Sequence, residues 1–129
     1  MLIAAQIIIA CAVGFLFVVG GVGVVSPRRV WPFWSSFAST PLKNAAECIP
    51  RALVGAAVIV DAESFLRPDW AFIAGCFLVG SAAVMLVFYR LHNRYAQMVV
   101  PPLKPFLRLH SLSAILLGIG ILFVWQPAG

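Results

Sequence analysis

The stretch SPRRVWPFWSSFASTPLKNAAECIPR, residues 26–51, lies between two long apolar runs and decides how the rest of the chain is organised. A second stretch, YRLHNRYAQMVVPPLKPFLRLH at residues 89–110, has the same order of features: arginine directly after an apolar run, then aromatic and polar residues, then Pro-Leu-Lys, then a new apolar run. Prolines in both stretches prevent one continuous helix. The sequence therefore predicts two pairs of helices, each joined by a basic connector, and it leaves open whether a two-helix unit is duplicated.

The composition places these helices in a lipid bilayer. Of the 129 residues, 63% are hydrophobic and only 10% are charged, whereas about a quarter of the residues of a soluble domain carry a charge. A membrane-spanning helix takes roughly 20 mostly apolar residues. We therefore expect an all-α polytopic integral membrane protein with one membrane domain, residues 1–129, and four transmembrane helices over about residues 2–25, 44–62, 70–89 and 106–125.

The charges, which sum to a formal net charge of +5, are segregated along the chain. The two connectors hold most of the basic residues: Arg28, Arg29, Lys43, Arg51, Arg90, Arg94, Lys104 and Arg108. Three of the four acidic residues lie between the two helix pairs: Asp61, Glu63 and Asp69. By the positive-inside rule, the connectors are cytoplasmic, and both termini, with the short tail after Trp125, are on the non-cytoplasmic side. We expect a bacterial inner membrane protein, and no signal peptide, because positive charge follows the first apolar run rather than preceding it.

The connectors mix basic and aromatic residues, a combination typical of the headgroup level of a bilayer. Seven of these residues are predicted to contact lipid or a partner: Arg28, Arg29, Trp31, Trp34, Arg90, Arg94 and Lys104. An aromatic cage for a cationic ligand is the alternative, and it requires the rings to converge on one point. Nucleic acid is not an expected partner, because no basic face or recognition module occurs.

The second apolar segment begins with charged residues. Glu47 and Arg51 are spaced i and i+4 in the favourable order, which predicts an intramembrane ion pair. Pro50 would prevent the pair if the regular helix began there. A charge at the bilayer centre costs roughly 2.5 to 3.5 kcal/mol on insertion scales, so pairing or a position near the membrane edge is expected. Two interpretations stay open: an ion pair that fixes the depth of the helix, and a proton or substrate site that faces the bundle interior.

No residue is predicted to act in catalysis or to bind a cofactor or a metal ion. The sequence contains no metalloprotease, P-loop or dinucleotide-binding motif. A divalent cation at the three acidic residues is conceivable, but Arg67 intrudes and the spacing matches no calcium loop. Haem would need axial histidines on different helices at matching depth, whereas His92 and His110 both lie in the second connector.

Small residues predict where helices pack, because they let two backbones approach closely. The small-xxx-small spacing occurs at three places: Ala52 and Ala56, Ala71 and Gly75, and Ala114 and Gly118. We expect the helix faces that hold Gly75, Gly80 and Gly118 to pack on helices. The three cysteines are far apart and are predicted to be small core residues: Cys11, Cys48 and Cys76.

All of these features are architectural. We therefore expect a non-catalytic membrane protein that acts as an accessory, assembly or stabilising subunit of a larger membrane complex. Its expected partners are membrane lipids and other integral membrane subunits or further copies of itself. The alternative is a small oligomeric transporter or channel that uses Glu47 and Arg51.

Overall fold

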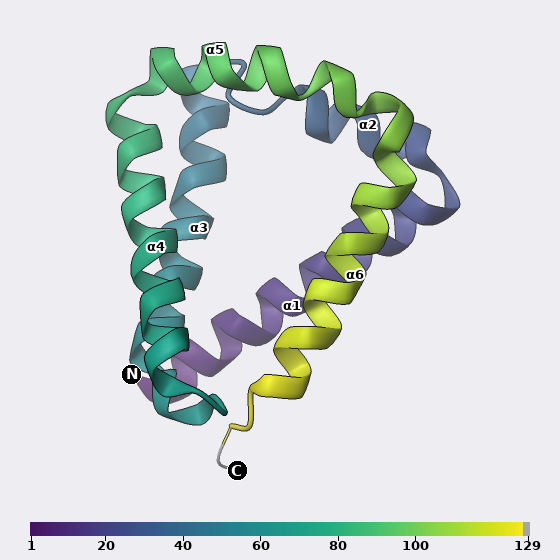
Figure 1. Ribbon diagram of the computed structural model, residues 1–129. Coiled ribbons are helices and arrows are strands. Elements are labelled where there is room, and N and C mark those ends of the chain that lie inside the picture. The colour runs from purple at the N-terminus through teal and green to yellow at the C-terminus, as the bar shows by residue number, and fades with distance from the viewer. Residues whose placement is uncertain (128–129) are drawn as a thin grey trace.

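The computed structural model describes residues 1–127 as helices joined by short turns (Figure 1). The prediction of an all-helical chain is confirmed over this range, and the end of the predicted tail, residues 128–129, lies outside it. The elements of the described part follow in the order α1 (Leu2–Val25), α2 (Pro27–Ser35), α3 (Pro41–Val60), η1 (Ala62–Ser64), α4 (Pro68–Val87), α5 (Tyr89–Val99), η2 (Pro101–Phe106) and α6 (Leu107–Val124).

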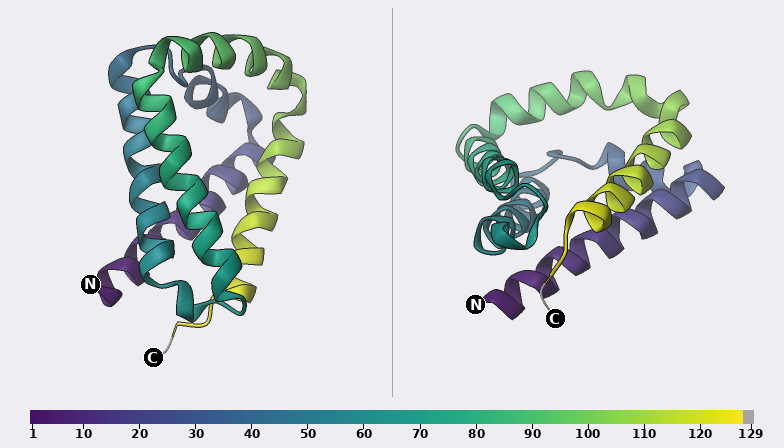
Figure 2. Two further views of the ribbon diagram at one scale, coloured as in Figure 1. Left: turned by 60° about the vertical axis from the view of Figure 1, so that its left-hand side comes forward. Right: turned by 60° about the horizontal axis from the view of Figure 1, so that its bottom comes forward.

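The long helices form two pairs. α3 and α4 pack side by side as an antiparallel hairpin joined by η1, and α1 packs along α6 (Figures 1 and 2). The pairs meet where α1 contacts α3, and they diverge from there toward α5, which runs across from α4 to η2 and α6. We call the end that contains η1, the start of α1 and the end of α6 the loop end. The opposite end, formed by α2, α5 and η2, is the connector end.

The two halves of the chain have the same order of elements. Each half consists of a long helix, a short amphipathic helix and a second long helix: α1, α2 and α3, then α4, α5 and α6. Pro-Leu-Lys opens α3 in the first half and lies in η2, directly before α6, in the second. This order matches the predicted alternation of apolar helices and connectors, while duplication of one unit remains a prediction.

Proline and a threonine cap decide where the hairpin helices begin. The Thr40 side chain accepts a hydrogen bond from the Lys43 backbone N–H at 3.1 Å, and Pro41 occupies the first turn of α3. Proline suits this position because its missing N–H has no partner there. α3 therefore starts at Pro41 rather than near residue 44, and it continues through Pro50, which removes only one backbone hydrogen bond. α4 likewise begins at a proline, Pro68.

Three helical stretches are long and apolar enough to cross a membrane: α1, α4 and the stretch from η2 through α6. These stretches support residence in a membrane, but the predicted fourth span, α3, is not among them. α3 has 20 residues, but its first half carries Lys43, Glu47 and Arg51. Each of these charges raises the cost of inserting the helix, so only residues 52–60 of α3 are uniformly apolar.

Glycines let the helices of each pair approach closely. At the crossing of α3 and α4, a Cβ atom on Gly55 would lie 2.8 Å from the Gly75 carbonyl oxygen, and a Cβ atom on Gly75 would lie 2.8 Å from the Gly55 carbonyl oxygen. Gly118 of α6 lies against the ring of Phe17 of α1, at 3.2 Å by the same measure. The predicted helix contacts are therefore confirmed at Gly75 and Gly118. The prediction is wrong for Gly80, where a Cβ atom would meet no described heavy atom within 4 Å.

Other small residues divide between packed and exposed faces. Ala71 and Gly75 are both buried, as predicted, whereas Ala56 of α3 is exposed. The α3 face that packs on α4 instead carries Gly55. Of the three cysteines only Cys48 is a core residue, and the other two, Cys11 and Cys76, are exposed on the outer faces of α1 and α4.

Candidate functional site

A buried carboxylate joins the elements of the loop end. Asp61 directly follows α3 and is 1% exposed. Its Oδ1 accepts hydrogen bonds from Ser64 Oγ at 2.6 Å and from Gln6 Nε2 at 3.3 Å, and its Oδ2 accepts one from Trp125 Nε1 at 2.6 Å. A negative charge at the C-terminus of a helix is opposed by the helix dipole, and these three donors offset that cost. Asp61 therefore connects α1, η1 and the segment after α6.

Backbone hydrogen bonds reinforce the loop end. The Leu66 N–H donates to the Val124 carbonyl at 2.8 Å, and the Gln126 N–H donates to the Ser64 carbonyl at 2.7 Å. A small apolar cluster packs at the same end: Ala5, Ile9, Ala57 and Trp125. The end of α6 is thus attached to the turn between α3 and α4 by both backbone and side chain.

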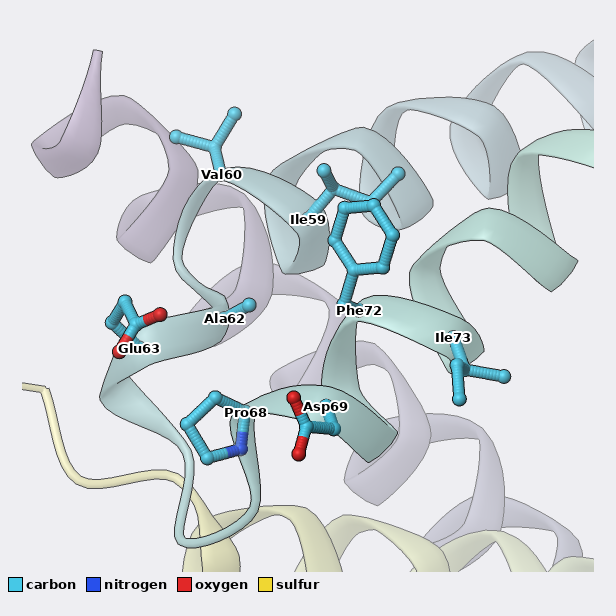
Figure 3. Close-up of a pocket in the computed structure, with 8 residues that line it drawn as sticks. All are labelled: Ile59, Val60, Ala62, Glu63, Pro68, Asp69, Phe72 and Ile73. Carbon is cyan, nitrogen blue, oxygen red and sulfur yellow. The ribbon is translucent and has the colours of Figure 1, made fainter.

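The other two acidic residues of the loop end stand apart from Asp61. Glu63 and Asp69 are exposed and line a pocket of about 410 Å³ between the end of α3 and the start of α4 (Figure 3). Figure 3 shows Glu63 on η1 and Asp69 at the start of α4, with Pro68 between them. Within residues 1–127, no three His, Cys, Asp or Glu side chains are placed to hold a metal ion. The expectation of solvated acids is thus confirmed for Glu63 and Asp69 and wrong for Asp61.

A second polar cluster lies at the connector end, between α3, α4 and α5. Asn44 is 2% exposed, and its Nδ2 donates a hydrogen bond to the Met85 carbonyl at 3.1 Å. Met85 lies in the last turn of α4, where carbonyls have no partner within the helix. Asn44 Oδ1 lies 2.6 Å from His92 Nδ1 and also accepts from Cys48 Sγ at 3.7 Å. One amide therefore closes the end of α4 and binds α5 to α3.

Glu47 faces this cluster rather than Arg51. Glu47 Oε1 lies 3.9 Å from His92 Nε2, and the two side chains are only 13% and 10% exposed. Arg51 Nη1 instead lies 3.5 Å from Met85 Sδ. The ion pair predicted between Glu47 and Arg51 is therefore wrong among the described residues. Its i, i+4 spacing is present, but the imidazole from α5 approaches Glu47 from across the helix boundary.

A second hydrogen bond holds α5 in place. Asn93 Nδ2 donates to the Ala38 carbonyl at 2.6 Å. Ala38 is fully buried in the turn between α2 and α3 and adopts a φ of 50°, which few residues other than glycine favour. The neighbouring pair His92 and Asn93 thus binds both α3 and this turn, so the inner face of α5 is fixed at two points.

The aromatic residues of the first connector pack against one another. Trp34 lies edge to face with Phe37 at a centroid distance of 4.9 Å and with His110 of α6 at 4.5 Å, and Phe33 contacts both Trp34 and Phe37. These rings fill a cluster rather than surround an open cage. Trp34 is half-buried in the cluster, so it contributes to packing of α2 on α6 more than the predicted lipid contact implied.

The predicted basic contact residues are largely free at the connector surface. Lys104 Nζ lies 5.3 Å from the centroid of the Trp31 ring, a cation–π contact between η2 and α2. The four arginines of the set are exposed: Arg28, Arg29, Arg90 and Arg94. The connector end therefore presents cations from both halves of the chain on one end of the molecule.

The two histidines belong to different clusters. His92 contacts Asn44 and Glu47, whereas His110 packs on Trp34. The structure therefore places the imidazoles in separate side-chain environments, and neither is exposed.

Sequence reasoning did not identify Asn44 or Asp61 as joining residues. One signal for Asp61 was available, because a carboxylate directly after a helix is unfavourable unless donors meet it. For Asn44 the sequence offered no comparable signal, since its partners lie on α4 and α5. Comparison of the chain with protein-family models, with curated proteins and with solved structures finds no match.

Proposed function

We propose that this chain is a non-catalytic membrane subunit that assembles with other integral membrane helices, as an accessory or stabilising component of a larger complex. In this proposal α3 crosses the bilayer beside α4, the connector end faces the cytoplasm of a bacterial cell, and the loop end faces the opposite side. The segregation of charge between the two ends supports this orientation.

The observation that carries the proposal is the set of glycines on the spans that contact nothing within the chain. Gly14 and Gly21, seven residues apart on one face of α1, and Gly80 on α4 have open space where a Cβ atom would be. In the same helices Gly20 and Gly75 are used for close packing. Glycine allows a second helix to approach closely in a membrane, so the open glycines provide sites at which helices of another subunit can dock.

The test is the mass of the complex that carries the tagged chain after gentle solubilisation. We expect the wild-type chain in a defined larger assembly, and we expect Gly80→Leu to reduce its association with that assembly by about tenfold, equivalent to 1.4 kcal/mol. Val84→Leu, on the same exposed face one turn further along, is the matched control and should assemble normally. A wild-type chain that runs alone would overturn the proposal.

The connector end adds a contact with anionic lipid to this proposal. Arg90 and Arg94 are exposed on α5, and the apolar side chains of Leu91, Tyr95 and Met98 form an exposed stripe beside them. A short helix with adjacent basic and apolar faces lies in the plane of a membrane surface. α5 would thus place its arginines among lipid phosphates.

We expect the double variant Arg90→Gln and Arg94→Gln to retain anionic lipid about 30-fold more weakly than the wild type. The estimate takes roughly 1 kcal/mol for each basic residue near an anionic surface. Retained anionic lipid per chain, measured after exchange into mixed lipid nanodiscs, gives the result. Arg67→Gln removes an exposed cation at the loop end and should have no effect; equal retention by all three proteins would contradict the lipid contact.

The transporter alternative has weaker support. Glu47 is half-buried but is not paired with Arg51, and residues 52–60 of α3 have no ionisable side chain between these charges and Asp61. Glu47 and Asp61 are roughly 20 Å apart along a helix that rises 1.5 Å per residue. α3 alone therefore offers no chain of polar groups that would carry an ion across.

A further inference from the structure

We propose that Glu47 and His92 share one proton, and that the pair is a proton-binding site loaded from the connector end. The proton lies between Glu47 Oε1 and His92 Nε2, which are 3.9 Å apart in the structure. The inference does not depend on the proposed role as a subunit, because it concerns contacts within one chain.

The hydrogen bonds of Asn44 decide which imidazole nitrogen faces Glu47. Because Asn44 Nδ2 donates to the Met85 carbonyl, its Oδ1 is the atom that faces His92. An amide oxygen only accepts hydrogen bonds, so His92 Nδ1 must carry a proton at 2.6 Å from it. In the neutral imidazole Nε2 is then an acceptor directed at Glu47, and a second proton at Nε2 makes it a donor.

Glu47 needs a proton or a cation, and His92 is the group placed to supply it. Glu47 Oε2 is buried and has no hydrogen-bond partner among the described residues. An unpaired carboxylate in such a place is costly. Arg51, one turn further along α3, directs Nη1 at Met85 Sδ. Either a protonated His92 faces ionised Glu47, or protonated Glu47 faces neutral His92, and both states hold the same single proton.

Few other charged groups face the pair. On α3, Lys43 is exposed in the first turn, Arg51 is half-buried, and the Cys48 thiol donates to Asn44. α4 has no acidic, basic or histidine side chain after Asp69, which lies at the far end of the helix. On α5, Arg90 and Arg94 are exposed and flank the face that carries His92. The turn of residues 36–40 contains no ionisable side chain. The pair thus titrates chiefly as a unit.

The proton state of the pair affects the docking of α5 on α3. With one shared proton the contact is attractive. Loss of that proton leaves an ionised Glu47 opposite the lone pair of His92 Nε2, so two acceptors face each other. Because the apolar stretch 52–60 follows, the proton enters and leaves at the connector end, and the site responds to the pH on that side of the membrane.

The test is ¹⁵N NMR of histidine-labelled protein in lipid nanodiscs across a pH titration. In the wild type, neutral His92 should be the Nδ1–H tautomer. In Glu47→Gln, His92 should bind its proton about tenfold or more weakly, because an adjacent anion favours the imidazolium; its titration then moves to lower pH by at least about one unit. Glu63→Gln, which removes an exposed acid at the loop end, should leave the titration unchanged.

His110 is an internal reference for folding, because its ring packs on Trp34 in the same molecule. An unchanged His92 titration in Glu47→Gln, with the His110 signal as in the wild type, would overturn the shared proton. If that variant does not fold, the tautomer of the wild type decides: the Nδ1–H form supports the site, and the Nε2–H form rejects it.

Discussion

Replacement of Gly75 by alanine should separate α4 from α3 and lower the free energy of unfolding by about 1–3 kcal/mol, the usual range for overpacking a filled contact. The added Cβ atom would lie 2.7 Å from Ile59 Cγ1, 2.8 Å from the Gly55 carbonyl oxygen and 3.1 Å from the Ile59 backbone nitrogen. Two of these atoms belong to the backbone of α3, so a side-chain rotation cannot relieve the overlap. Denaturant titration of the protein in mixed micelles measures the change.

The matched control lies in the same helix. Gly80→Ala introduces the same methyl group where no described heavy atom is within 4 Å. Alanine favours a helix over glycine by about 0.8–1.0 kcal/mol, so this variant should be neutral or slightly more stable than the wild type. The two substitutions are thus expected to act in opposite directions. Equal stability of Gly75→Ala and Gly80→Ala would show that α3 and α4 do not meet at this glycine.

These two glycines also show how far the sequence predicts packing. Small-residue spacing identified Gly75 correctly because Ala71 lies one turn before it on the same face. The same reasoning assigned Gly80 to a helix contact, and within this chain it has none. Composition and spacing locate residues that permit a close approach, but they do not show which face meets a neighbour. That depends on how the two helix pairs meet, which is a tertiary property.

The polar contacts follow the same division. The positions of the apolar helices and connectors were predictable, because hydropathy and proline act locally. The partner of Glu47 was not predictable from the i, i+4 rule, because His92 comes from α5, after the whole of α4. Trp34 was expected at a lipid surface and instead packs on His110 of α6. In each case a contact between distant segments outweighs the local pattern.

Replacement of Asp61 by alanine should lower the free energy of unfolding by about 3 kcal/mol, because a buried donor that loses its acceptor costs about 1–3 kcal/mol. The Trp125 indole N–H and the Ser64 hydroxyl both lie 2.6 Å from this carboxylate. Asp61→Asn should cost less, since one amide oxygen remains as an acceptor while the other position becomes a donor. Denaturant titration compares the variants.

The position of Asp61 makes this effect regional as well as global. Its three partners come from α1, η1 and the residue after α6, so losing the carboxylate releases contacts between both helix pairs. We therefore expect faster amide hydrogen exchange at residues 62–66 and 121–126 in Asp61→Ala, with little change in α5. Asp69→Ala removes an exposed acid from the same end and should stay within about 0.5 kcal/mol of the wild type. If Asp61→Ala and Asp69→Ala were equally stable, the buried carboxylate would not hold the loop end together, and the backbone bridge between Leu66 and Val124 would have to do so.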